Sequence, residues 1–535
     1  MANKKYSNKG KNYKDRDHLT DTGAEGKWDK KGKKMGDHYN DPMWYAQNEA
    51  LLNDAASFAY SWPLGSRISL GADFTSQSIP GILTYRLAPA IGKSTDAYSA
   101  VNVASKQLYS WIRHANSGAK NYESADLMMY ILATTEAYAY YEWLKRIYGM
   151  AQIYSVTNRY YPFALISSNG VNYKDVMYNL ADLRYYINQY AVKLGSLCIP
   201  AGMTYTQRRR WVFQNYYVDS KDTAKAQTYM FIPDGFWSYD ELSGPGTLKY
   251  NRFTPPPAGY SVHDLMEDGN VLLEFLLASE DIGIMSGDIL KAYTKDGIEK
   301  VSDIDESYMV LPSYSEEVLW QINNATVLPS PDANSMDVTQ DASIGSGAIL
   351  FNPKWTFIAD QGSDFSRAGL IYTWDRLCNM THDDVKPAET MVATRLMAVL
   401  EEDPTVETGL TYVLNSAGSD FCVGCNITRF LIDNSSDVQS WELEIEPAPD
   451  YAVTIANPTP ESLNIVSELG LLENFDWHHM TVFSFRWDQD VQAWTDSLFQ
   501  DVSNYAIIPA HGIAKMNDTA ILSLFSAPQV ARYSK

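Results

Sequence analysis

Histidines and acidic residues gather at two places where they could hold a metal ion. Residues 475–479 read FDWHH, and residues 382–384 read HDD. Imidazole and carboxylate groups are common ligands of zinc and related metals, but adjacent residues cannot all face one ion without a specific turn. We therefore expect no metal site, and we expect these histidines to cap loops or to pack beside aromatic rings.

Four cysteines, at positions 198, 378, 422 and 425, are too few for a disulfide scaffold in a chain of 535 residues. Only Cys422 and Cys425 have the CxxC spacing of zinc sites and redox pairs. A zinc site needs a second pair or matching histidines, and a redox pair needs a thioredoxin-like βαβ context. Neither is found, so we expect two small apolar side chains in a turn.

Common catalytic motifs are absent from the sequence. It contains no GxxxxGK[ST], no GxGxxG after a strand, no HExxH and no GxSxG. The stretch GIMSGD at 283–288 has its serine in the wrong position for a nucleophile elbow. We predict a non-enzyme with no catalytic residues and no cofactor. A hydrolase that uses an Asp/Glu pair as acid and base has no motif of its own and stays open as an alternative.

The first 35 residues carry the opposite charge to the rest of the chain. They hold eleven basic and five acidic residues, a local charge of +6, whereas the whole chain carries −22 and the other 500 residues therefore −28. A basic tail on an acidic body predicts a polyanion partner on one side only. The residues expected to bind it are Lys4, Lys5, Lys9, Lys11, Lys14, Lys27, Lys30, Lys31, Lys33 and Lys34.

Two features complicate this reading of basic residues. Asp15, Asp17, Asp21 and Glu25 separate the two lysine clusters, and a solubility segment or a nuclear address is an alternative role for the tail. A second basic spot, residues 208–210, is a run of three arginines. Consecutive residues of a helix point in three directions, so we expect at least one of these arginines to pair with a carboxylate of the body.

The elements that must position these groups are mainly helical in the first half. The tail is predicted to end near residue 42, and apolar periodicity predicts helices from Trp44 to about residue 235. Residues 123–148 are apolar over a wide arc, so this helix should be buried on several sides, with Ser124 as its cap and Asp126 in its first turn. Its last turn should hold Lys145 and Arg146. Residues 173–192 should form a helix whose apolar face consists of Val176, Leu180, Leu183, Ile187 and Tyr190.

The second half mixes helices and strands. The Pro- and Gly-rich residues 237–260 predict a long excursion, and residues 262–295 predict a helical block. A helix is expected over 386–402, with Pro387 in its first turn. Strands are expected at 428–433, at 441–447, where WELEIEP alternates, and at 480–487. The fold class is therefore mainly α, of α+β type.

The bulk composition adds three expectations. The most apolar stretch, VLLEFLLA at 271–278, is interrupted by Glu274, so no membrane span is expected. The N-terminus lacks the apolar core of a secretory signal, which predicts a protein made and used in a cytosol. Aromatic residues make up 13% of the chain. They suit either surfaces buried against other subunits or helical cores, and the sequence favours neither.

Three stretches together resemble the capsid protein of picobirnaviruses. They are IRHANSGAKNYESADLMMYILA at 112–133, MTYTQRRRWVFQNYYVDS at 203–220 leading into KAQTYMF at 225–231, and EDIGIMSGDILKAY at 280–293. FDW at 475–477 and the SAPQ that ends at 529 fit less distinctively. Between about 300 and 470 only the general layout is similar.

This resemblance implies a viral coat protein found in the virion and made in the host cytoplasm. Its partners would be itself, as sixty symmetric dimers in an icosahedral shell, and the segmented double-stranded RNA genome inside. The lysine-rich arm would contact phosphates without reading bases. The alternative from another class, a helical, Trp-rich carbohydrate-binding surface protein, needs an N-terminal signal and a lipid-bearing cysteine.

The resemblance also implies a domain organisation. A largely helical shell domain would carry a smaller projecting domain of mixed α/β character and a flexible basic arm. The expected ranges are 1–42 for the arm, 43–235 for the first part of the shell domain, 236–300 for an excursion and helical block at the junction, 301–470 for the mixed region that contributes to the projecting domain, and 471–535 for a C-terminal segment that returns to the shell.

Overall fold

The computed structural model describes most of the chain from residue 44 onward. The described residues are 44, 47–58, 67–68, 77–78, 81–118, 122–153, 161–221, 227–242, 245–332, 334–344, 347–356, 375–406, 411–433, 440–454, 460–488 and 493–526. The chain divides into two compact units, residues 1–60 and 61–535. In the first unit, helix α1 (Glu49–Ala56) begins at Asn48, whose side chain accepts a hydrogen bond from the backbone N–H of Leu51.

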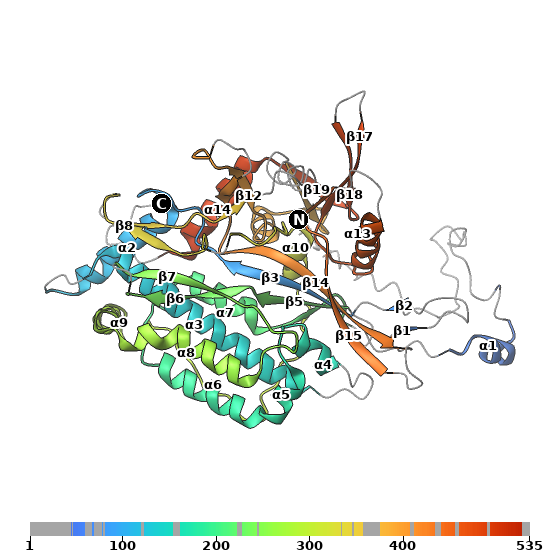
Figure 1. Cartoon of the computed structure of the whole chain (residues 1–535), viewed down its shortest axis with the longest axis horizontal. Helices are drawn as coiled ribbons and strands as arrows, with labels where there is room; N and C mark the ends of the chain where they lie inside the picture. The colour runs from blue at the N-terminus through green and yellow to red at the C-terminus, as the bar shows by residue number, and fades with distance from the viewer. Residues whose placement is uncertain are drawn as a thin grey trace, which may run out of the picture. The chain divides into compact units, whose positions relative to one another are not determined.

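A five-stranded sheet forms the middle of the second unit, in the order β15-β14-β3-β5-β4 (Figure 1). Strand β3 pairs parallel to β5, and the other pairs are antiparallel. Parallel neighbours need a long crossover connection, and here that crossover contains helices α2 to α7. The strands are β3 (Ile82–Pro89), β4 (Tyr217–Val218), β5 (Thr228–Pro233), β14 (Asp420–Asp433) and β15 (Ser440–Pro447).

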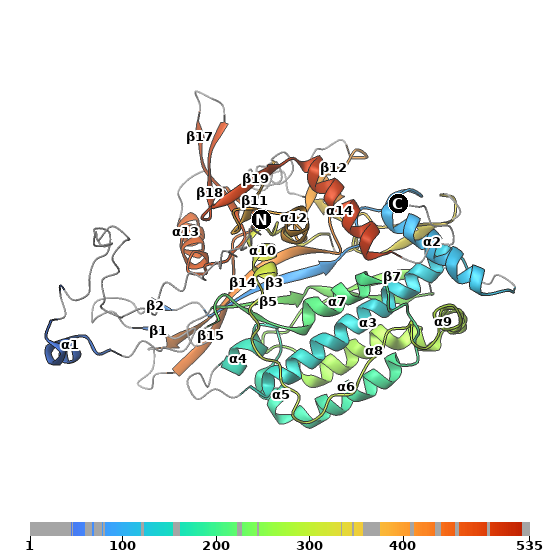
Figure 2. The same ribbon diagram turned by 180° about the vertical axis from the view of Figure 1, so that it is seen from behind.

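Helices α3 to α8 cover one face of this sheet (Figures 1 and 2). Helix α3 lies in their middle, with 25 of its 28 residues buried, because it packs against α2, α6, α7 and α8 at once. Gly269 of α8 permits close packing, since a Cβ there would meet the hydroxyl of Tyr186 and the ring of Tyr140. The helices are α2 (Ala100–Ala115), α3 (Ser124–Ala151), α4 (Tyr161–Ser167), α5 (Tyr173–Tyr178), α6 (Leu180–Leu194), α7 (Thr204–Gln214), α8 (Val262–Ala278) and α9 (Glu280–Tyr293).

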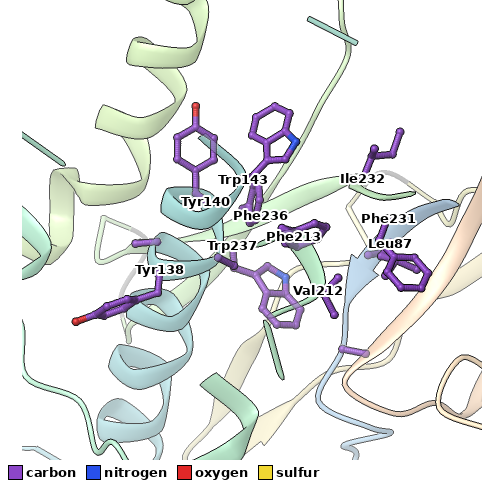
Figure 3. Close-up of a cluster of buried hydrophobic side chains, with 14 of the residues drawn as sticks. Leu87, Tyr138, Tyr140, Trp143, Val212, Phe213, Phe231, Ile232, Phe236 and Trp237 are labelled. Atoms are coloured by element: carbon purple, nitrogen blue, oxygen red, sulfur yellow. The ribbon is translucent and has the colours of Figure 1, made fainter. Parts of the chain in front are cut away.

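The main core lies between this helical layer and the sheet, and large aromatic rings fill much of it (Figure 3). The hairpin of β6 (Gly235–Asp240) and β7 (Thr247–Arg252) is inserted there and contacts α3, α8 and β3. The Tyr140 ring stands edge-on to the Phe236 ring, with centroids 5.4 Å apart. The indole N–H of Trp237 donates to the carbonyl of Met336 at 2.8 Å.

Smaller sheets and four helices cover the other face of the central sheet (Figures 1 and 2). The helices are α10 (Glu316–Asn323), α12 (Pro387–Ala393), α13 (Pro460–Leu472) and α14 (Ala510–Leu524). The sheets pair β10 (Lys354–Thr356), β13 (Thr411–Ser416) and β12 (Val399–Glu402); β11 (Arg376–Met380) and β19 (Asn504–Ile508); and β16 (Ala452–Thr454), β17 (Thr481–Asp488) and β18 (Ala493–Phe499). Two further pairs are β1 (Arg67–Ile68) with β2 (Gln77–Ser78), and β8 (Thr339–Asp341) with β9 (Ala348–Leu350).

The predicted helices are largely confirmed, with interruptions at polar residues. Residues 173–192 form α5 and α6, separated by Asn179, and the predicted apolar face is buried except for the partly exposed Leu180. Residues 262–295 form α8 and α9, separated at Ser279. Ser279 ends α8 and also begins α9, because its hydroxyl accepts from the N–H of Ile282. Side chains that bond to backbone N–H groups favour such a restart.

The ends of helix α3 differ from the prediction. The cap is Glu123, not Ser124, and Asp126 completes a capping box by accepting from the N–H of Glu123 at 2.9 Å. The helix continues to Ala151, so Lys145 and Arg146 do not lie in the last turn. The burial predicted on several sides is confirmed, and it includes Arg146, which donates to the side-chain oxygen of Asn169.

Two element predictions were wrong. Residues 237–260 are not a long excursion, because most of them form the hairpin β6–β7. Pro245 and Gly246 lie in the connection between its strands and the other prolines follow β7, while β6 is covered on both faces and β7 is partly exposed. Residues 386–402 form only the short helix α12, with Pro387 at its start as predicted, and then strand β12. The apolar run around Leu400 is buried beside β13. The strands expected at 428–433, 441–447 and 480–487 are confirmed within β14, β15 and β17.

The α+β fold class is confirmed, with its helices concentrated in the first half. The central sheet takes strands from both halves of the chain, since β14 pairs with β3 over seven residue pairs. Two of its strands, β14 and β15, thus come from the 301–470 range, and β3 comes from the 43–235 range. The domain ranges given above stay predictions.

Candidate functional site

The three consecutive arginines lie on α7 between helix α3 and strand β14. Arg209 is fully buried and donates from Nε and Nη2 to both carboxylate oxygens of Glu136, at 2.8 and 2.9 Å. It also donates from Nη1 to the buried Asp420. Burial alone would lower the pKa of Arg209, but Glu136 and Asp420 outweigh it and raise this pKa. The guanidinium therefore stays charged and joins α3, α7 and β14.

The neighbouring arginines are also paired with carboxylates. Nε of Arg208 lies 3.5 Å from Oδ2 of Asp420. Arg210 donates to Glu142 at 2.6 Å and to Glu299 at 2.9 Å. The expectation that at least one arginine pairs with a body carboxylate is confirmed for all three. Their charges serve the fold and are compensated within the chain.

His479 is buried in a polar cage at the end of the FDWHH stretch. Its Nε2 donates to the carbonyl of Pro449 at 2.6 Å, and its Nδ1 accepts from the hydroxyl of Tyr85 at 3.2 Å. The same hydroxyl oxygen accepts from the backbone N–H of His479. Burial lowers the pKa of His479 to about 3, with a smaller contribution from His478. The neutral ring therefore acts as a structural link between strand β3 and the chain before β17.

This cage predicts an acid-sensitive fold. The pKa of His479 is about 3 in the folded chain and 6.5 in the reference state. Below pH 6.5 the imidazole of His479 binds a proton in the unfolded chain but stays neutral in the folded chain. The free energy of unfolding is therefore highest above pH 6.5 and decreases as the pH falls below 6.5. At pH 5 this linkage costs about 2 kcal/mol. Urea unfolding at pH 7 and pH 5 measures the loss.

Two variants test whether His479 is the source. His479→Gln keeps a donor for Pro449 but cannot titrate, so it should lose most of the extra acid sensitivity. The matched control is His511→Gln on the exposed face of α14, which should keep the wild-type pH dependence. Equal pH dependence of the His479 variant and wild type would show that other groups cause the effect.

The remaining histidine stretch and the cysteines are also structural. The His382 ring stands edge-on to the Trp320 ring, with centroids 4.8 Å apart, so the predicted packing beside aromatic rings is confirmed for His382 and His479. Cys422 and Cys425 do not lie in a turn but on either side of a β-bulge in β14. Burial raises the pKa of Cys422 to about 12, which disfavours the thiolate that metal binding and disulfide exchange require.

A small cavity lies beside Tyr140, Phe253 and Asp268, and its volume is about 100 Å³. Asn251 and Arg252 also line it, but Asn251 is bound to Ser238, and Arg252 to Asp234. Burial raises the pKa of Asp268 to about 6. Pockets for small-molecule substrates usually measure about 300–1,000 Å³. The space is therefore suited to a few water molecules rather than to a substrate.

Most described aromatic side chains belong to the core, which favours the core over the interface as the main reason for the aromatic content. A smaller set of large apolar side chains is exposed on helices, and four of them, Met177, Tyr178, Tyr185 and Val192, lie on α5 and α6. No helix in the part of the chain that the structure describes is both long and apolar enough to cross a membrane. Residue type alone did not predict which of these side chains are exposed, because Tyr185 is exposed whereas Tyr190 in the same helix is buried.

The ten lysines predicted to bind RNA lie outside the described residues, and their role stays a prediction. They are Lys4, Lys5, Lys9, Lys11, Lys14, Lys27, Lys30, Lys31, Lys33 and Lys34.

The buried charged and polar groups described above pair with one another and hold the fold together. Comparison with known families then gives a more specific assignment. The model of the picobirnavirus capsid protein family matches residues 44–430, and the chain belongs to this family. It is therefore a capsid protein and not an enzyme.

Two relatives support the assignment. The capsid protein precursor of human picobirnavirus (strain Human/Thailand/Hy005102/-) is 29% identical over 561 residues, covering 98% of this chain and 97% of the relative. The X-ray crystallographic structure of the picobirnavirus capsid matches the fold with a TM-score of 0.80 at 22% identity. That match covers 92% of this chain and 100% of the other.

Proposed function

We propose that this capsid protein assembles as symmetric dimers, sixty of them per particle, into an icosahedral shell that encloses a segmented double-stranded RNA genome. The observation that carries the proposal is membership of the picobirnavirus capsid protein family over most of the chain. The protein would be made in the host cytoplasm and reside in the virion. Its partners would be other copies of itself and the genome.

The charge distribution supports different roles for the two parts of the chain, with RNA contact by the arm and shell formation by the body. Residues 1–35 carry +6, and the other 500 residues carry −28. The ten lysines of the arm would neutralise phosphates without reading bases, which suits packaging of any sequence. The body is unsuited to this task, because its excess carboxylates repel RNA and its Arg209 and Arg210 are paired internally.

The domain ranges belong to the same proposal. Residues 43–235 and 471–535 would build the shell, with residues 236–300 at the junction. The mixed region 301–470 would contribute to a projecting domain, and residues 1–42 would form the arm inside the particle. An arm that ends near residue 42 agrees with the family match, which begins at residue 44.

The proposal is tested by expressing the full chain and separating it by size-exclusion chromatography. We expect closed particles in the void fraction by negative-stain electron microscopy. We also expect dimers as the smallest species after mild dissociation, because obligate interfaces bury about 2,000–5,000 Å² and hold such units together. A protein that stays monomeric at micromolar concentration and neutral pH would contradict it.

A further inference from the structure

One side of the α5–α6 segment exposes large apolar side chains to solvent. The exposed fractions are 90% for Tyr178, 65% for Tyr185 and 72% for Val192. Tyr185 and Val192 are seven residues apart, about two helical turns, so they lie on one face of α6. Tyr178 is the last residue of α5, immediately before the break at Asn179 that precedes α6. Figures 1 and 2 show α6 at the outer edge of the helical layer.

The opposite side of α6 already supplies its share of the core. Leu183, Ile187 and Tyr190 are buried, and they pack in the cluster that includes α3 and α8. A helix in a single folded chain needs one apolar stripe, and the other side is usually polar. The second stripe is therefore not explained by the fold of one chain, and stripes of this kind mark contact surfaces.

The charges beside the stripe are arranged for self-association. Asp182 is exposed and has no ion pair within the described part of the chain, and Lys193 contacts only the side-chain oxygen of Asn270, at 3.2 Å. The two residues lie about 8 Å on either side of the midpoint of α6, at a rise of 1.5 Å per residue. In an antiparallel pair of α6 helices, Asp182 of each copy would thus face Lys193 of the other.

The residues near the midpoint suit a two-fold axis. The amide of Gln189 donates to the hydroxyl of Tyr185 at 3.0 Å, which holds the Tyr185 ring along the helix. Ala181, one turn before Tyr185, is small and exposed and allows a second helix to approach. A tyrosine ring that is already held in place loses little conformational entropy when it is buried in a contact. Tyrosines are for this reason frequent at the centres of protein–protein interfaces.

We propose that this face, formed by Tyr178, Ala181, Tyr185, Gln189 and Val192, binds the same face of a second copy of the chain, antiparallel and about a two-fold axis near residue 187. The inference rests on the proposed assembly and names one of its contact surfaces. We choose a second copy of the chain as the partner, because the same face carries both the apolar side chains and the charges that would complement each other across a two-fold axis.

Cross-linking tests this contact directly. The four native cysteines are buried, so a short bismaleimide should react mainly with an introduced cysteine. We expect Gln189→Cys to give covalent dimers in assembled particles. The matched control Thr519→Cys, on the exposed face of α14, should give none. Particles in which Gln189→Cys yields no more dimer than the control would overturn the inference and leave the proposed assembly standing.

A charge-swap series separates a specific contact from chance proximity. Asp182→Lys disrupts two pairs per interface and should weaken dimerisation roughly tenfold, since exposed pairs contribute up to about 1 kcal/mol each. The double variant Asp182→Lys with Lys193→Asp should restore the wild-type affinity. Equal loss in the single and double variants would contradict the antiparallel arrangement. Absence of dimers and particles in the wild type would instead refute the proposed function.

Discussion

Replacing Arg209 by alanine should lower the free energy of unfolding by about 3–5 kcal/mol, because it leaves buried carboxylates without their cation. Arg209 is the shared partner of Glu136 on α3 and Asp420 on β14, and all three side chains are shielded from solvent. Asp420 would keep the Ser419 hydroxyl, at 2.8 Å, and the more distant Arg208, at 3.5 Å. Urea unfolding followed by tryptophan fluorescence at neutral pH measures the change.

The matched control is Arg184→Ala. Arg184 also lies on a helix and pairs with Glu306, at 3.8 Å, but this pair is open to solvent. Such surface pairs contribute up to about 1 kcal/mol, so the control should remain close to wild type. If the two variants lost similar stability, the buried arginine would not be the link between helices and sheet that its contacts indicate.

The sequence predicted several of the helices because their apolar residues recur with helical period. The face of α6 through Leu183, Ile187 and Tyr190 was recognised in this way and is buried. The interruptions at Asn179 and Ser279 were missed, because a polar residue inside a helical pattern has no effect on the apolar period. Ser279 restarts a helix through one side-chain hydrogen bond, which the periodicity does not reveal.

Strands buried on both faces were harder to predict than helices. β3 and β6 contain few alternating positions, since nearly every residue is buried, and β6 was hidden within a Pro- and Gly-rich stretch. The pairing of β3 with β14 joins residues more than 300 positions apart, and nothing local specifies it. The arginine run illustrates the same limit: its pairing with carboxylates could be predicted, but the partners Glu136 and Asp420 could not.

Deleting residues 1–42 should leave particle formation intact and remove most of the packaged RNA. The arm carries a net charge of +6, and the other basic spot identified in the sequence, residues 208–210, is paired with carboxylates of the body. If about six phosphates are neutralised per arm, affinity for RNA should fall roughly a thousandfold between 50 and 200 mM salt, and a body without the arm should lose this contribution. The measurement is the ratio of absorbance at 260 nm to that at 280 nm for purified particles.

A second variant separates the charge of the arm from its length. Replacing its ten lysines with glutamine keeps the chain length but changes the local charge from +6 to −4. If phosphate contacts hold the genome, this variant should lose RNA as completely as the deletion does. If the glutamine variant packages RNA like wild type while the deletion does not, the arm acts through its length or volume and not through its charge. RNA retained in both variants would show that the acidic body contacts the genome. This result would contradict the electrostatic argument, because local binding sites on the body would then have to overcome the repulsion from its charge of −28.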